Sequence, residues 1–287
     1  MLRLANADLS VDLLDPTDAT DQARQGVRYC WGGYIWQVND ARSGPLLAGP
    51  EWPKADPLPF DGQGLPESFR HAEFGTNRPL MLRDGRGWII GIGRVGPGTD
   101  GKLAVTEPCT WHVTPTTAAL EFCTSQSGDG YASQLTRHVA LKGRTVVSST
   151  QLTNTGEQPL PLHWFAHPFF ALTDRLVTCD LPPGYGVAEN PGYALDARNQ
   201  LSMKRRFDGV FDGHFEPLHI APRQPLRVRL SHPKLAEIIF TADFTPDFCP
   251  IWGNGNTWSI EPYLMTELAP GATRTWTLSY EFGTARA

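Results

Sequence analysis

Glycine and proline are spread through this whole chain, and their distribution limits its fold more than any other sequence feature. The 287 residues include 28 glycines and 25 prolines, and no linker concentrates them. Proline removes a backbone donor from a helix interior and glycine destabilises one, so this spacing leaves little room for long helices. No window shows an amphipathic pattern of three helical turns. We therefore expect many short strands separated by turns.

Short runs with a period of two predict where those strands lie. Residues 226–230 (LRVRL) and 276–282 (WTLSYEF) alternate apolar and polar side chains, as a half-buried strand does. Three more runs are apolar, β-branched or aromatic and are bounded by turn formers: 34–38 (YIWQV), 87–92 (GWIIGI) and 236–241 (AEIIFT). Without alternating helices there are no βαβ units. The sequence predicts an all-β fold of antiparallel sheets, packed face to face or closed into a barrel, in one domain over residues 1–287.

Composition excludes several classes of partner. Hydrophobic residues make up 40% of the chain, enough for a sizeable core, and 19% of the residues are charged. The formal net charge is −5, so no general field attracts nucleic acid or anionic lipid. We expect a globular protein that binds neither nucleic acid nor membrane.

The chain also lacks the usual signs of export. Residues 1–16 carry acidic side chains where a signal peptide needs an apolar run, and no stretch approaches the ~18 apolar residues of a membrane helix. The five cysteines are odd in number and form no CxxC pair, which disfavours a disulfide framework or a structural zinc site. We expect reduced thiols and a cytoplasmic location.

One apparent nucleotide motif does not have the context it needs. Residues 91–96 (GIGRVG) fit G-x-G-x-x-G, but residues 97–102 (PGTDGK) follow, and these cannot begin the helix that would hold a pyrophosphate. We interpret the segment as a glycine-rich turn between strands. G-x-S-x-G, H-E-x-x-H and P-loop patterns are absent from the sequence, so the commonest hydrolase, zinc-protease and nucleotide signatures are missing.

Two histidines, His163 and His167, lie four residues apart, a zinc-binding spacing on a helix. Pro161 and Pro168 flank them, so a strand is expected here instead. On a strand the two side chains share a face but lie roughly 13 Å apart, at about 3.3 Å per residue. We therefore expect no metal site, and we expect His163 to pack.

The same region resembles a known family. Residues 151–172 (QLTNTGEQPLPLHWFAHPFFAL) resemble the segment of the aldose 1-epimerase (galactose mutarotase-like) superfamily in which a strand ends in N-x-G and the next closes on H-P-[YF]-F. The matching positions are Asn154, Gly156, His167, Pro168, Phe169 and Phe170. Residues 258–282 (WSIEPYLMTELAPGATRTWTLSYEF) are similar to the family's Glu-Pro strand, its APG turn and its last strand, and the glutamate is Glu261. In residues 209–218 (GVFDGHFEPL), Asp212 stands where relatives carry an aspartate.

The first half of the chain departs from the family pattern. Relatives carry a His-Gly-Phe-x-Arg element, whereas residues 69–80 (FRHAEFGTNRPL) place Ala72 after His71. No arginine stands in register. Arg78 is the preferred substitute and Arg70 is another.

The resemblance implies a galactose mutarotase-like super-sandwich and a sugar mutarotase that needs no metal or organic cofactor. Such an enzyme opens the sugar ring by removing the proton of the anomeric hydroxyl while protonating the ring oxygen. By resemblance, His167 is the general acid at the ring oxygen and Glu261 the general base at O1. Substrate hydroxyls would be held by Asp212, His71, Arg78 and Arg70. Stacking on the sugar is assigned to one of three tryptophans: Trp252, Trp258 or Trp164.

Two other functions stay open at this stage. A carbohydrate-binding protein without turnover fits the same fold, because fold does not fix function. A carbohydrate-processing enzyme of another reaction class, such as a lyase or hydrolase, also fits, although no further acid-base motif supports it. The partner expected in each case is a small-molecule sugar, and the oligomeric state is left open, with a homodimer as one arrangement.

Overall fold

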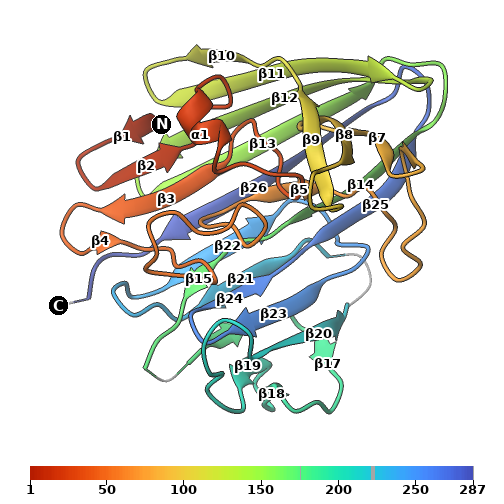
Figure 1. Ribbon diagram of the computed structural model, residues 1–287. Helices are drawn as coiled ribbons and strands as arrows, with labels where there is room; N and C mark the ends of the chain where they lie inside the picture. Colours follow the sequence, from red (N-terminus) through yellow and green to blue (C-terminus); the bar gives the residue numbers. More distant parts are fainter. Residues whose placement is uncertain (175, 221–223, 287) are drawn as a thin grey trace.

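The computed structural model describes residues 1–174, 176–220 and 224–286. The strand pairs in these residues are antiparallel (Figure 1). The one helix in the described residues is a single turn, α1 (Ala19–Gln22), which Asp18 caps through its side-chain oxygen. The expectation of an all-β, antiparallel fold is confirmed.

A ten-stranded sheet forms the larger layer of the sandwich. In spatial order its strands are β10 (His112–Pro115), β11 (Ala119–Gly128), β12 (Tyr131–Lys142), β13 (Thr145–Asn154), β26 (Thr273–Phe282), β22 (Ile238–Ala242), β21 (Arg227–Leu230), β16 (Thr178–Asp180), β19 (Gln200–Met203) and β18 (Tyr193–Leu195). β26, the last strand along the chain, lies inside this sheet between β13 and β22.

Two smaller sheets form the layer that carries the site. One has three strands: β25 (Tyr263–Leu268), β14 (Leu160–Ala166) and β5 (Glu67–Phe69). The other has five: β15 (Phe170–Ala171), β24 (Thr257–Ile260), β23 (Pro250–Asn254), β20 (Gly213–His219) and β17 (Gly186–Val187). Aromatic side chains join the layers, because Trp164 of β14 packs 5.1 Å from Trp276 of β26, and Phe170 of β15 lies 6.2 Å from Phe240 of β22.

Two four-stranded sheets complete the fold. The first is β1 (Leu2–Ala5), β2 (Leu9–Leu13), β3 (Ile35–Asp40) and β4 (Gly44–Pro45). The second is β6 (Leu82–Arg83), β7 (Arg86–Ile89), β8 (Gly93–Pro97) and β9 (Leu103–Pro108). One buried apolar cluster runs from Leu4 to Phe282 and includes side chains of all these sheets.

A buried ion pair attaches β5 to the ten-stranded sheet. Arg137 of β12 lies 2.8 Å from the carboxylate of Glu67, and both side chains are almost fully buried. Arg137 also donates to Thr150 and to the carbonyl of Gly32, each at 2.9 Å, while Ser148 donates to Glu67 at 2.6 Å. Because buried charges are costly unless paired and hydrogen-bonded, this network holds β5 in place. The residues that come directly after β5 form part of the site.

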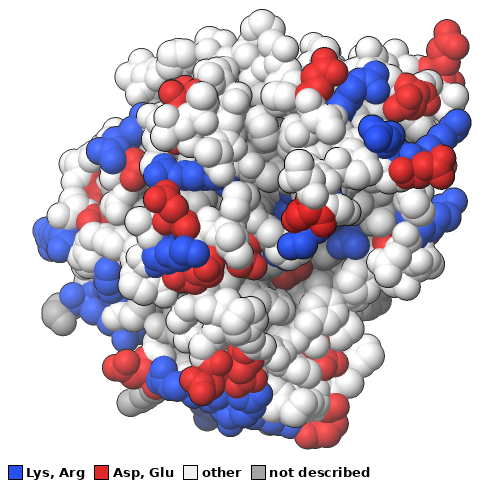
Figure 2. Space-filling view, in the orientation of Figure 1, with Lys and Arg blue, Asp and Glu red and all other residues white. Residues whose placement is uncertain are grey.

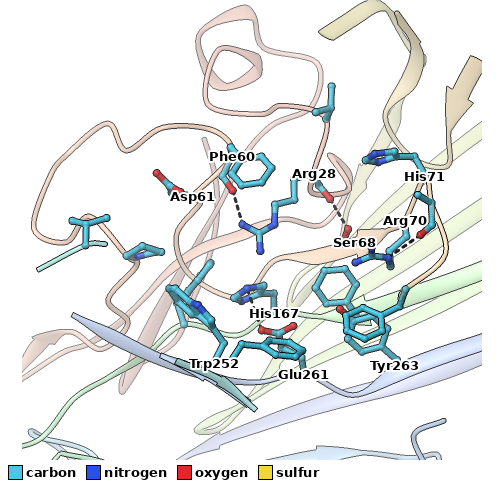
Figure 3. A pocket seen from close by; sticks show the side chains of 18 of the residues that line it. Arg28, Phe60, Asp61, Ser68, Arg70, His71, His167, Trp252, Glu261 and Tyr263 are labelled. Atoms are coloured by element: carbon cyan, nitrogen blue, oxygen red, sulfur yellow. Dashed lines mark hydrogen bonds and ion pairs between the residues drawn. The ribbon is translucent and has the colours of Figure 1, made fainter. Parts of the chain in front are cut away.

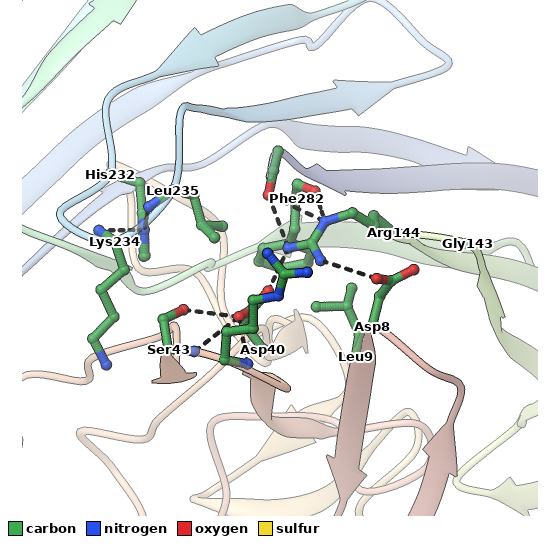
Figure 4. Close-up of polar contacts among 12 residues, drawn as sticks. Asp8, Leu9, Asp40, Ser43, Gly143, Arg144, His232, Lys234, Leu235 and Phe282 are labelled. Carbon is green, nitrogen blue, oxygen red and sulfur yellow. Dashed lines mark hydrogen bonds and ion pairs between the residues drawn. The ribbon is translucent and has the colours of Figure 1, made fainter. Parts of the chain in front are cut away.

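A second arginine connects the first four-stranded sheet to the end of β26 (Figure 4). Arg144, in the turn between β12 and β13, donates to Asp40 at the end of β3 at 2.7 Å and to the carbonyl of Phe282 at 2.9 Å. Burial acts to raise the pKa of Asp40, but the hydrogen bonds from Arg144, Ser43 and Arg42 outweigh it, so the pKa is lowered. The carboxylate of Asp40 is therefore stabilised in the folded protein.

The predicted strand segments overlap β3, β7, β21, β22 and β26, although residues 90–92 of segment 87–92 form a turn. The glycine-rich segment 91–96 is only partly a turn, because residues 90–92 turn and β8 begins at Gly93. A Cβ on Gly93 would lie 2.2 Å from the carbonyl oxygen of Glu107 on β9, and φ there is +130°. Glycine is thus required within the β8 and β9 pair.

The expectation that His163 and His167 lie on one strand is wrong, because His167 lies outside the strand. β14 ends at Ala166, so His167 lies in the connection to β15, and no single strand carries both histidines. Pro168 has no N–H to continue a ladder, and the amide of His167 instead donates to the carbonyl of Pro66 at 2.9 Å. His163 is half-buried on β14, opposite Met265 of β25.

Candidate active site

A cavity of about 530 Å³ opens beside the ends of the smaller sheets. Figure 3 shows His167, Trp252, Glu261 and Tyr263 at its base, with Arg28 reaching toward His167 from a loop on the opposite side. The remaining walls come from residues 60–61, from the stretch after β5 and from aromatic side chains. The volume is in the range of pockets that bind small molecules.

His167 and Glu261 face each other at the base of this cavity. Nε2 of His167 lies 3.2 Å from Oε1 of Glu261. Backbone hydrogen bonds hold both residues just beyond strand ends, since His167 donates to Pro66 and Glu261 donates to Pro250, each at 2.9 Å. Their exposed fractions are 2% and 4%, so the pair is shielded from bulk solvent yet lines the cavity.

Aromatic rings surround His167 and fix its position. The imidazole centroid lies 4.4 Å from the ring of Phe169, 5.8 Å from Trp252 and 6.0 Å from Tyr29. Nδ1 of His167 is buried and has no hydrogen-bond partner among the described residues. Glu261 lies beside the other ring nitrogen, Nε2, so a proton on Glu261 makes Nε2 its acceptor and leaves the ring proton on Nδ1.

Burial shifts the two pKa values in opposite directions. Burial raises the pKa of Glu261 to about 8, although the charges of Arg28 and Arg70 act to lower it. Burial lowers the pKa of His167 well below its usual value, and the charge of Arg28 adds to this effect. Burial therefore favours a proton on Glu261 over a proton on His167.

Two arginines line the cavity. Arg70, one of the expected binding residues, donates to the carbonyl of Ala72 at 2.9 Å. Arg28, which was not expected, donates to the carbonyl of Phe60 at 2.9 Å. Arg28 is half-buried between Val27 and Tyr29, and because no motif marks it, sequence reasoning missed it.

The other expected site residues divide into two groups. His71 lines the cavity, and burial lowers its pKa. Arg78 and Asp212 are not among the residues that line the cavity. Arg78 is exposed and pairs with Glu73, while Asp212 accepts hydrogen bonds from Arg205 at 2.6 and 2.7 Å.

The three tryptophans also differ in position. Trp252 of β23 is half-buried and lines the cavity. Trp164 and Trp258 are fully buried in the apolar core. The structure thus brings together five of the residues considered above: His167, Glu261, His71, Arg70 and Trp252.

Three further observations concern metals, thiols and membranes. Within residues 1–174, 176–220 and 224–286, no three His, Cys, Asp or Glu side chains gather as metal ligands do. All five cysteines are free thiols. Across the same described ranges, the structure has no helix with the length and apolar character needed to cross a lipid bilayer.

Acidic and basic side chains are mixed on the surface of the protein. On the face that Figure 2 shows, Lys and Arg lie among Asp and Glu. The mixture fits the small net charge of −5.

No family model and no curated protein matches this chain. Solved structures do resemble it over nearly its whole length. A protein from Escherichia coli K12, described provisionally as an aldose 1-epimerase, is 15% identical with a TM-score of 0.62, over 98% of this chain and 97% of that one. A galactose mutarotase related enzyme from Lactobacillus acidophilus is 15% identical with a TM-score of 0.61, over 99% and 97%.

A galactose mutarotase-like protein from Lactobacillus casei gives 13% identity and a TM-score of 0.58, over 98% of this chain and 99% of that one. At such identities the likeness establishes the fold. The chain has the galactose mutarotase-like fold that its motifs implied, which confirms that expectation.

Proposed function

We propose that this protein is an aldose 1-epimerase-like mutarotase, which interconverts the α and β anomers of a sugar. The observation that carries the proposal is the 3.2 Å separation of His167 and Glu261 at the base of a cavity of about 530 Å³. An acid and a base must reach two oxygens of one ring together. Two adjacent groups in a shielded cavity meet that requirement.

The reaction needs one proton on the pair. In the roles implied by the resemblance, Glu261 takes the proton of the anomeric hydroxyl at O1 while His167 gives a proton to the ring oxygen. The C1 to ring-oxygen bond breaks and the sugar becomes an open aldehyde. After rotation about C1–C2 the ring closes on the other face, and both protons return.

The ligand-free pocket is one proton transfer away from this arrangement. Burial favours the proton on Glu261, whereas a general acid at His167 must carry it. A bound sugar hydroxyl that donates to Glu261 stabilises the carboxylate and lowers its pKa. The 3.2 Å separation then allows direct transfer to Nε2.

The rest of the cavity supplies groups that hold a sugar. His71, Arg70 and Arg28 line it with hydrogen-bond donors, and the ring of Trp252 offers an apolar surface. Asp212 and Arg78 were expected to bind substrate, but their positions outside the lining favour the two lining arginines for that role. No step in this reaction requires a cofactor.

Anomeric equilibration tests the proposal. Freshly dissolved α-glucose or α-galactose is expected to reach equilibrium faster with the protein, as followed by polarimetry or proton NMR. His167→Ala and Glu261→Gln should each remove about 100- to 10,000-fold of the acceleration, the usual contribution of acid-base groups. His163→Ala and Glu267→Gln are matched controls outside the cavity and should keep it.

Two outcomes contradict the proposal in different ways. Saturable sugar binding with no acceleration for any sugar tested identifies a binding protein on the same fold. Full activity in both His167→Ala and Glu261→Gln leaves the reaction class intact but shows that this pair does not perform it.

A further inference from the structure

Unlike several arginines of this chain, the two arginines of the cavity have no carboxylate partner among the described residues. Arg144 pairs with Asp40 and Arg205 pairs with Asp212. Among the described residues, Arg28 donates to the carbonyl of Phe60, while Arg70 donates to the carbonyl of Ala72 and also interacts with the hydroxyl of Tyr263, so neither arginine has a carboxylate partner. Both guanidinium groups are half-buried in one pocket, where an unpaired cation is costly.

Phenylalanine rings and carbonyl groups hold both guanidinium groups in place. Cζ of Arg28 lies 4.7 Å from the ring centre of Phe60, whose carbonyl also accepts its hydrogen bond. Cζ of Arg70 lies 5.6 Å from the ring centre of Phe74. A guanidinium has five N–H donors, and these hydrogen bonds use only some of the donors on each group, so others remain for a ligand.

These contacts also account for two apolar side chains at the surface. Phe60 and Phe74 are exposed by 63% and 38%, which is unusual for large apolar residues. The guanidinium of Arg28 lies against the ring of Phe60 (Figure 3), and the guanidinium of Arg70 lies against the ring of Phe74. Cation–π contact of this kind orients an arginine without neutralising it.

The acidic groups in the lining do not balance the two cations. The carboxyl groups that line the cavity are Asp61 and Glu261. Burial raises the pKa of Glu261 to about 8, so at neutral pH this group is mostly uncharged. One carboxylate then faces two guanidinium groups, and the pocket has an excess of positive charge.

We propose that this pocket selects sugars that carry an anionic group, a carboxylate or a phosphate, and that Arg28 and Arg70 recognise that group. Planar guanidinium donors match both anions, and charge-assisted hydrogen bonds to them are about twice as strong as neutral ones. This inference rests on the proposed function, which supplies the sugar, and it adds that the sugar is acidic.

Binding to the unaltered protein is the first test. Calorimetric titration with glucose, glucuronate and glucose 6-phosphate should show at least one acidic sugar binding about tenfold or more tighter than glucose, as a charged hydrogen bond predicts. The two acidic sugars tell whether carboxylate or phosphate is preferred. Raising the salt concentration should weaken binding of the acidic sugar and leave binding of glucose unchanged. Equal affinities for all three sugars overturn the proposal.

Variants then assign the preference to residues. Arg28→Gln and Arg70→Gln should each weaken binding of the acidic sugar by about tenfold more than they weaken binding of glucose. Arg83→Gln removes an exposed arginine outside this cavity and is the matched control. If a glutamine variant does not fold, as judged by circular dichroism, Arg28→Lys replaces it, and the salt dependence of the unaltered protein decides the outcome.

The two proposals fail separately. An enzyme that equilibrates glucose and acidic sugars equally well, in both arginine variants, keeps the proposed function and loses this inference. Tight, salt-sensitive binding of an acidic sugar without any acceleration keeps the inference and removes the mutarotase function.

Discussion

Glu261 and His167 reach each other from two different sheets of the same layer. Glu261 follows β24 and His167 follows β14, and backbone hydrogen bonds hold each residue so that the two side chains lie 3.2 Å apart. Their contact couples the two titrations, because interacting sites lose their protons in two steps that belong to the pair.

The first prediction concerns pH. The active pair carries one proton, and the pKa of Glu261 is raised to about 8. Catalysed mutarotation should therefore fall as pH rises through about 8, when the pair loses that proton. On the acid side the rate should fall only at pH values well below 6.5, because burial lowers the pKa of His167. Polarimetric kcat/KM against pH, corrected for the buffer rate, checks this, and a rate still rising above pH 9 contradicts it.

The second prediction concerns Trp252. Its ring lines the cavity beside His167, at 5.8 Å. Trp252→Ala should raise KM about threefold to tenfold through lost contact with the sugar, with kcat nearly unchanged, and Trp252→Phe should recover part of the loss. Steady-state kinetics separate the two parameters. A fall in kcat at constant KM would instead assign Trp252 to holding His167.

The third prediction concerns the buried ion pair of Glu67 and Arg137. Glu67→Gln leaves the guanidinium of Arg137 buried without its counter-charge, and breaking such a pair costs about 3–5 kcal/mol. Urea unfolding should show this loss in the free energy of unfolding. Glu237→Gln, which breaks a surface pair with Arg229, is the control and should cost about 1 kcal/mol or less. Similar losses in the free energy of unfolding of the two variants would show that the buried pair stabilises the fold no more than the surface pair does.

The fourth prediction concerns acid stability. Because the folded-state pKa of Asp40 is lowered, its contribution is complete above the unfolded pKa of about 3.9 and is lost as pH falls through the folded value. Asp40→Asn should lower stability at neutral pH and flatten its dependence on pH below about 5. Asp8→Asn alters a more exposed carboxylate 3.9 Å from the same Arg144 and should leave that dependence intact. Unfolding by urea at several pH values measures both.

Local patterns in the sequence predicted the strands, because alternation and β-branching act within a few residues. Segments 226–230 and 276–282 needed no knowledge of their neighbours, and they form parts of β21 and β26. The order of strands in the sheets was beyond such reasoning. It depends on contacts between residues far apart in sequence.

The candidate site was predictable where motifs carry it and not elsewhere. His167 and Glu261 came from matched motifs, and the structure places them together. Arg28 lies in no motif and enters the cavity only through the packing of its loop. Asp212 had a motif but has a local partner, Arg205, which holds its carboxylate outside the cavity. Pairing of this kind is decided by side-chain geometry that the sequence does not contain.

The central place of β26 in its sheet determines how this chain must be made. β13 and β22 pair with the two sides of β26, so each has an unpaired edge on the ribosome until residues 273–282 have been synthesised. Exposed strand edges pair readily with other chains. The nascent protein therefore needs protection from aggregation until β26 has been synthesised, and by then Glu261, which precedes β26 in the sequence, is also available to complete the cavity.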